Sequence, residues 1–240
     1  MREPFDKFEE GTTVEDFLTE LRGFLRRHHP RDSRIVRAIA DGTASRPAVR
    51  GFAREIYALS AISLRPFAAM VSNAPDERSF RLALENFASE AGLLGEAPHP
   101  ALFRRFALAT GASAAELDAH VPLPSTLGAM YALERSLRGP FDEAVAGFGL
   151  AIEGPASEWG GLVLAGLREH YRFDDDALRF WILHFQEDGD SALEAQHAEN
   201  ARLLLRRFAA TAEQQARLGR VYVHSVLLFE NLFLGMASFL

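Results

Sequence analysis

Apolar residues recur three and four positions apart along nearly the whole chain, and this spacing constrains the fold more than any other feature of the sequence. In residues 13–28, for example, apolar side chains at positions 17, 18, 21, 24 and 25 share one face of a helix. Alternating apolar and polar residues between turn residues, the pattern of strands, are hard to find. The sequence therefore predicts an all-α fold. Because no repeat or long linker divides the chain, we expect a single domain over residues 1–240.

Capping residues, prolines and glycines predict where the helices begin and end. Thr13 starts the first helix and Pro30 stops it, while Pro47 suits the first turn of another. The aspartates at 174–176 suit a helix N-terminus because acidic groups there complement the helix dipole. We expect helices over residues 13–28, 34–40, 45–70, 77–91, 99–110, 125–137, 140–153, 157–170 and 213–239, and one from 174 to 208 that is either continuous or interrupted at Gly189.

The composition excludes several classes of function. With 33 acidic and 26 basic residues the net charge is −7, which disfavours nucleic-acid and anionic-membrane partners. The chain has no cysteine, so disulfides, zinc–thiolate sites, iron–sulfur clusters and thiol nucleophiles are excluded. Lys7 is the only lysine and no glycine-rich phosphate loop occurs, which argues against Schiff-base chemistry and nucleotide-dependent folds. The N-terminus lacks the apolar core of a signal peptide, so we expect a cytoplasmic protein.

One segment, residues 221–240, is long and apolar enough to raise the question of a membrane span. His224, Glu230 and Asn231 lie within it, and a charged group near the centre of a bilayer costs about 2.5–3.5 kcal/mol. We therefore interpret the segment as a buried helix, and expect no membrane contact.

Four ionisable residues share helix faces with apolar side chains, where an unpaired charge is costly to bury. Glu90 and Glu153 each follow apolar residues at spacings of three, seven and eight. His184 follows Trp181 at three, and Asp188 lies one turn beyond His184. If these side chains converge, they provide the carboxylate and imidazole ligands suited to non-haem iron or manganese. His99 joins them if the loop after Glu90 folds back.

Each of these residues also has a purely structural interpretation. A single glutamate on an apolar helix face more often reaches solvent or pairs with an arginine. A single core histidine such as His184 is more often a hydrogen-bonded structural residue than a ligand. Only the combination of the positions favours a metal site.

The order of the sequence blocks resembles the haem-oxygenase-like fold shared by thiaminase II, the pyrroloquinoline-quinone synthase and the haem-oxygenase-like diiron oxidases. The similarity runs through HHPRDSRIVRAIADGTASRPAVRGFAREIYALSAISLRPFAAMVSNAPDERSFRLALENFASEAG, HPALFRRFALATG, GFGLAIEGPASEWGGLVLAGLREHYRF and DDDALRFWILHFQED, which are residues 28–92, 99–111, 147–173 and 174–188. It covers most of the chain. The absence of cysteine argues against the thiaminase branch, whose nucleophile is a cysteine.

The resemblance to the diiron branch implies a set of metal ligands: Glu90, His99, Glu153, His184 and Asp188. Glu134 lies in a similar local string, but the spacing to Tyr171 and His184 favours Glu153, and Glu134 is expected at the surface or in a salt bridge. In addition to their role as ligands, Glu90, Glu153 and His184 are the expected catalytic residues.

The chain departs from the diiron pattern at the last ligand, because Ser191 stands where that pattern has a histidine. Either one metal site is weakened, or a break at Gly189 brings in another residue. His197 is one candidate; the acids at 187, 190 and 194 are the others. On an unbroken helix His197 would lie about 220° around the axis from His184, so it requires that break.

The resemblance implies an oxidoreductase with two irons that uses dioxygen as co-substrate and acts on a small molecule, such as an amino acid or another carboxylate. Desaturation, carbon–carbon cleavage and N-oxygenation are the alternative outcomes. Glu55 is a candidate auxiliary ligand, and Arg54 or Arg65 a candidate to hold a substrate carboxylate. An external electron donor is an allowed partner, and the resemblance implies a homodimer. Two rivals remain: a cofactor-free enzyme of the quinone-synthase type, which uses histidine and arginine as acids and bases, and a non-catalytic helical binding protein.

Overall fold

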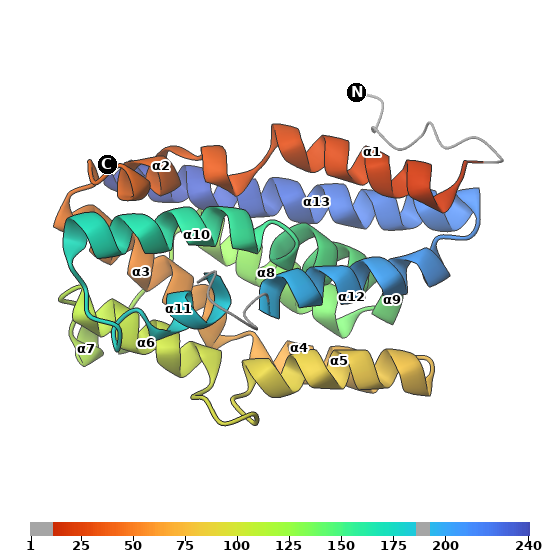
Figure 1. The fold of residues 1–240 in the computed structure, drawn as a ribbon, viewed down its shortest axis with the longest axis horizontal. Helices are drawn as coiled ribbons and strands as arrows, with labels where there is room; N and C mark the ends of the chain where they lie inside the picture. The colour runs from red at the N-terminus through yellow and green to blue at the C-terminus, as the bar shows by residue number, and fades with distance from the viewer. Residues whose placement is uncertain (1–11, 186–192) are drawn as a thin grey trace.

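The computed structural model describes residues 12–185 and 193–240, and the side chains of residues 193–198 lie outside that description. Every regular element in these ranges is helical, as the sequence predicted. The helices run mostly along one direction, with α1 (Val14–Arg27) lying along α13 (Ala212–Met236) at one side of the molecule and α4 (Leu64–Ser72) and α5 (Glu77–Glu90) at the other (Figure 1).

Between these two sides lie the elements that surround the centre of the bundle (Figure 1). The last long helix, α13, packs against η2 (Val145–Glu153) and α8 (Pro124–Arg138), while α3 (Arg46–Ala61) packs against α6 (His99–Ala109). The remaining elements are η1 (Pro30–Asp32), α2 (Arg34–Ala40), α3 (Arg46–Ala61), α6 (His99–Ala109), α7 (Ala114–Asp118), α8 (Pro124–Arg138), α9 (Phe141–Ala144), η2 (Val145–Glu153), α10 (Ala156–Gly166), η3 (Leu167–Tyr171), α11 (Arg179–Phe185), α12 (Leu193–Phe208) and η4 (Ala237–Phe239).

Capping side chains fix most helix starts where the sequence predicts them. Thr13 accepts a hydrogen bond from the backbone N–H of Asp16, Ser45 from that of Ala48, and Asp76 from that of Ser79. The starts of these helices therefore agree with the predicted ones to within a few residues.

The prediction of one helix over residues 45–70 was wrong, because the chain breaks between α3 and α4. Pro66 has no N–H to donate to the carbonyl of Ile62, and its ring crowds the preceding turn. Ser63 instead donates its hydroxyl to the carbonyl of Ser60 at 2.9 Å. Ser60 and Ser63, which lie at this break, line the central cavity.

Two segments predicted as ordinary α-helix are π-helical. These segments, η2 and η3, form the C-terminal parts of the predicted helices 140–153 and 157–170. Short π segments occur often at functional sites. The helix expected from Asp174 begins only at Arg179, after a turn in which Asp174 accepts from the N–H of Ala177. The short helix α7 was not predicted.

The apolar C-terminal segment forms most of α13, the one helix in the described ranges that is long and apolar enough to cross a membrane by length and composition. Its buried side chains include Leu218, Tyr222, Phe229 and Phe233, which belong to the two hydrophobic clusters of the bundle. This packing agrees with the interpretation of the segment as a buried helix.

Candidate metal centre

A cavity of about 1000 Å³, including its open mouth, lies at the centre of the bundle. Helices α3, α8 and α13 and the segment η2 supply most of its wall, and its surface is mostly apolar. Its polar side chains are Ser60, Ser63, Glu90, His99, Ser136, Glu153 and Ser225.

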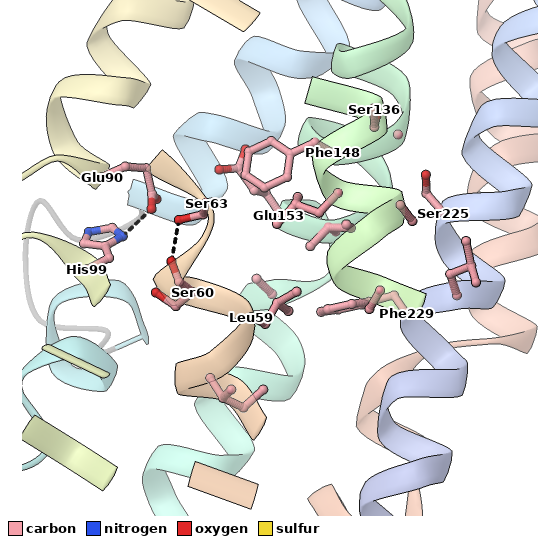
Figure 2. A pocket seen from close by; sticks show the side chains of 18 of the residues that line it. Leu59, Ser60, Ser63, Glu90, His99, Ser136, Phe148, Glu153, Ser225 and Phe229 are labelled. Atoms are coloured by element: carbon pink, nitrogen blue, oxygen red, sulfur yellow. Dashed lines mark hydrogen bonds and ion pairs between the residues drawn. The ribbon is translucent and has the colours of Figure 1, made fainter. Parts of the chain in front are cut away.

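Glu90, His99 and His184 come together beside this cavity. One potential ligand atom from each lies within 4.8 Å of the others. The Nδ1 atom of His99 is 2.7 Å from Oε2 of Glu90, and the rings of His99 and His184 are 4.3 Å apart between centroids. His99 and His184 are buried, with 5% and 2% of their surfaces exposed. Figure 2 shows Glu90 and His99 pointing toward each other at one side of the cavity.

The loop between α5 and α6 brings Glu90 and His99 together. Glu90 is the last residue of α5 and His99 the first of α6. Gly92 has a φ of 71°, and a Cβ there would lie 2.6 Å from the carbonyl oxygen of Glu96, so the tight return needs glycine. Pro100 occupies the first turn of α6, where its missing N–H is not needed. The loop folds back as the sequence interpretation required.

His184 is held in an orientation that suits a ligand. Its Nδ1–H donates to the carbonyl of Phe180, one turn earlier in α11, at 2.7 Å. This bond fixes the tautomer, so that Nε2 carries the lone pair, as in most metal-binding histidines. The ring of Phe180 stacks on that of His184 with centroids 4.2 Å apart and limits its rotation.

Glu153 lines the same cavity but does not belong to the 4.8 Å group. It is the last residue of η2, and 6% of its surface is exposed. Asn86, on α5, donates its side-chain N–H groups to both carboxylate oxygens at 3.2 Å. The amide therefore orients a buried carboxylate toward the helix that also carries Glu90.

These residues fit an iron ion. Two imidazoles and one carboxylate, buried and converging, are the donor set of many non-haem ferrous oxygenases. The hydrogen bond from His184 Nδ1–H to a backbone carbonyl is the support that such ligands need. Glu153, on a neighbouring element and lining the same cavity, is an additional oxygen donor of the kind that two-metal carboxylate sites use.

The remaining predicted ligands cannot be placed in the same way. Asp188 lies outside the described residues, as do Ser191 and Gly189. His197 lies within α12, but its side chain is not among those described. These assignments therefore stay predictions.

Other residues singled out from the sequence do not line the cavity. Glu55 is buried, and its carboxylate accepts hydrogen bonds from His120 Nε2 at 2.8 Å and the N–H of Leu123 at 3.1 Å. Arg54 donates to Nδ1 of the same histidine at 2.8 Å. Arg65 is exposed. Neither arginine lines the cavity, so neither is placed to hold a substrate there.

Glu134, which was expected at the surface, forms an ion pair with Arg138 at 3.1 Å, and both side chains are about half exposed.

Sequence reasoning missed the neutral polar residues of the site. Asn86, Ser136 and Ser225 carry no charge. Burying them costs less free energy than burying a charge, so they do not stand out in the helical pattern of the sequence. The only available signal was their position on faces otherwise made of apolar residues.

A family model described as "Iron-containing redox enzyme" matches residues 50–226, which is most of the chain. This range contains all of the predicted ligands. No curated protein matches the chain.

Several solved structures share the fold. A TenA homologue from Pseudomonas syringae pv. tomato superposes with a TM-score of 0.77 at 14% identity, covering 96% of this chain and 99% of that one. A CADD-like protein of unknown function from Nostoc punctiforme gives 0.72 at 13% identity, covering 94% and 97%. A domain of unknown function with a haem-oxygenase-like fold from Shewanella denitrificans gives 0.69 at 17% identity, covering 93% and 90%. At these identities the similarity establishes the fold alone, which is the predicted haem-oxygenase-like one.

Proposed function

Because the chain belongs to the family of haem-oxygenase-like iron-containing redox enzymes, we propose that it is a non-haem diiron oxidase or oxygenase that uses dioxygen to oxidise a small molecule. The observation that carries this proposal is the convergence of Glu90, His99 and His184 beside a largely apolar cavity. The three side chains supply ligands, and the cavity supplies space for a substrate next to them.

Glu90, His99 and His184 would hold one iron, and Glu153 would contribute to a second together with Asp188 or His197. When bound, iron would activate dioxygen and accept electrons from the substrate or from an external donor. Phe180 and the Phe180 carbonyl keep the His184 ring in place, and Asn86 keeps the Glu153 carboxylate in place. The apolar wall, including Phe148, Phe229 and Trp159, would exclude water from the reacting groups.

Titration of the metal-free protein with ferrous iron in the absence of oxygen tests this proposal. We expect about two irons per chain, and an absorption change when oxygen is then admitted. One iron per chain would overturn the two-metal part of the proposal. No retained iron would overturn all of it and favour the cofactor-free enzyme or the non-catalytic binding protein.

Matched variants make the titration specific. His184→Ala is expected to lower the iron content, whereas His224→Ala, which removes an exposed histidine of α13, is not. Glu153→Ala is compared in the same way with Glu134→Ala, which removes a half-exposed glutamate. Equal iron content in all four variants would contradict the assigned ligands.

A further inference from the structure

A second cavity, of about 540 Å³ including its open mouth, lies among α1, α12, α13 and the end of η2. Figure 1 shows α1 running along α13, the two helices that form one side of it. The cavity shares no lining residue with the central one, and none of the predicted metal ligands lines it. A molecule bound in it would therefore be distinct from the substrate of the proposed oxidase.

Three arginines line this second cavity: Arg22 of α1 and Arg202 and Arg206 of α12. Arg206 donates to Glu15 at 2.8 Å, and Arg202 donates to Glu199 at 3.3 Å. Arg22 donates only to a carbonyl and a hydroxyl of its own helix, and it forms no ion pair in the described part of the chain. It is therefore the guanidinium group most open to pairing with a ligand.

The charges of the wall favour a ligand with a single negative charge. The hydrogen bond from Arg206 holds the pKa of Glu15 below its usual value, so this carboxyl group is ionised at neutral pH. Together with Glu199 it offsets two of the three guanidinium groups, which leaves one positive charge. One anionic group would balance that charge, whereas a second negative charge would stay unpaired.

The hydroxyl of Tyr222, on α13, is a further donor at this cavity. Tyr222 lines the cavity with 1% of its surface exposed. Its hydroxyl forms no hydrogen bond with a described residue, yet its oxygen is not among the fully enclosed polar atoms, as that of Ser136 is. Burial raises the pKa of this phenol, so the oxygen keeps its proton. Buried tyrosine hydroxyls usually have a hydrogen-bond partner, and a ligand in the cavity would supply one.

The rest of the wall is largely apolar, with Leu18 and Leu25 from α1 and Leu150 from η2. Covering these side chains with an apolar group removes their surface from water, which is favourable. An inorganic anion would leave that surface uncovered. The wall therefore suits a molecule that has one anionic end and an apolar part.

We propose that this cavity binds a small carboxylic acid, with its carboxylate on Arg22, Arg202 and the hydroxyl of Tyr222 and its apolar part on the leucines. Arg202 is chosen over Arg206 because it is the arginine whose charge acts on the Tyr222 hydroxyl. A carboxylate carries the single charge that the wall balances, and its planar shape matches that of a guanidinium group. The inference does not depend on a bound metal.

Calorimetric titration of the full, metal-free chain with hexanoate and with inorganic phosphate tests the inference. We expect one hexanoate per chain to depend on this cavity, and phosphate to bind more weakly. Arg22→Gln and Tyr222→Phe should each weaken hexanoate binding by about tenfold, the effect of one lost hydrogen bond to a charged group.

Matched controls separate this site from general effects of charge and packing. Arg26→Gln removes an exposed arginine one turn further along α1, and Tyr131→Phe removes an exposed tyrosine hydroxyl. Neither residue lines the cavity, so each substitution should change hexanoate binding by less than about twofold.

The proposal is overturned if hexanoate does not bind, or if Arg22→Gln and Tyr222→Phe weaken it no more than the two controls do. Tighter binding of phosphate than of hexanoate, with the same dependence on Arg22 and Tyr222, would also overturn the assignment of a carboxylic acid. Because no iron is added, these results are independent of the iron titration.

Discussion

At the scale of single residues, Ser136 shows how a buried hydroxyl can reduce stability. Its hydroxyl is buried and has no hydrogen-bond partner among the described residues, a situation that costs about 1–3 kcal/mol in other proteins. We expect Ser136→Ala to leave the free energy of unfolding of the ligand-free protein unchanged or to raise it by up to about 1 kcal/mol, as measured by urea denaturation.

Ser45→Ala provides the opposite control for the same chemical change. Ser45 caps α3 by accepting from the N–H of Ala48 at 3.2 Å, so its loss should lower the free energy of unfolding by about 0.5–2 kcal/mol. Similar losses for both variants would mean that the Ser136 hydroxyl has a partner in solution.

Residues of the site differ in how far the sequence could predict them. Glu90 and His184 attracted attention because ionisable groups rarely lie on apolar helix faces, and His99 because it begins the next helix after Glu90. The structure brings these three together. Asn86 and Ser136 are compatible with either a surface or a core, so their sequence positions said nothing. The pairing of Glu55 with His120 depends on how the loop before α8 folds over α3, which no local pattern specifies.

At the scale of the helices, α10 contains two glycines that differ sharply in their surroundings. A Cβ on Gly166 would lie 2.3 Å from the carbonyl oxygen of Ile39 in α2, whereas a Cβ on Gly161 would have no neighbour within 4 Å. We expect Gly166→Ala to lower the free energy of unfolding by about 1–3 kcal/mol, because α2 must move. Gly161→Ala should raise it by up to about 1 kcal/mol through helix propensity. The pair is measured by urea denaturation, and the absence of a loss in Gly166→Ala would contradict the close packing of α2 on α10.

An ion pair joins α5, which carries Glu90, to α12. Arg207 donates to Asp76, the N-cap of α5, at 2.8 Å, and this bond, with the N–H of Ser79, lowers the pKa of Asp76 to about 2. A carboxyl group whose pKa is lowered by folding stabilises the protein above its unfolded pKa, and this contribution is lost as the pH falls through the folded pKa.

The pH dependence of unfolding should therefore change in Asp76→Asn. We expect the variant to melt at a lower temperature than the wild type at pH 7, and the difference to shrink between about pH 4 and pH 2, where Asp76 becomes protonated. Asp118→Asn is the control, because Asp118 contacts Arg104 at the longer distance of 3.7 Å. A constant difference between wild type and Asp76→Asn over this range would contradict the lowered pKa.

Helix boundaries were predictable where a single side chain determines them, as at Thr13, Ser45 and Asp76. The break before α4 was visible in principle, since Pro66 lies four residues after Ile62, but the continuous apolar pattern masked it. The π segments were not predictable, because the same apolar spacing fits hydrogen bonds to the fourth or the fifth preceding residue. Packing of η2 against α13 and α12 decides between them.

At the scale of the whole molecule, the proposed metal would connect helices that are distant in the sequence. Its ligands come from α5, α6 and α11, so bound iron would stabilise only the folded state. At iron concentrations about a hundred times the Kd, we expect the free energy of unfolding to rise by about 2.7 kcal/mol, which raises the melting temperature by roughly 5–10 °C.

Thermal denaturation with ferrous iron, and again after a chelator, measures this stabilisation. His184→Ala should show little of the increase, whereas His224→Ala should show all of it. An equal increase in both variants would place the iron elsewhere on the protein.

The position of α13 in the chain has a consequence for biosynthesis. This helix covers apolar faces of α1, α8 and η2, and its residues Ser225 and Phe229 complete the wall of the central cavity. All of those elements leave the ribosome before residues 212–236 do, and until then their apolar faces remain open to other proteins. The nascent chain is therefore most dependent on chaperones just before its longest described helix emerges.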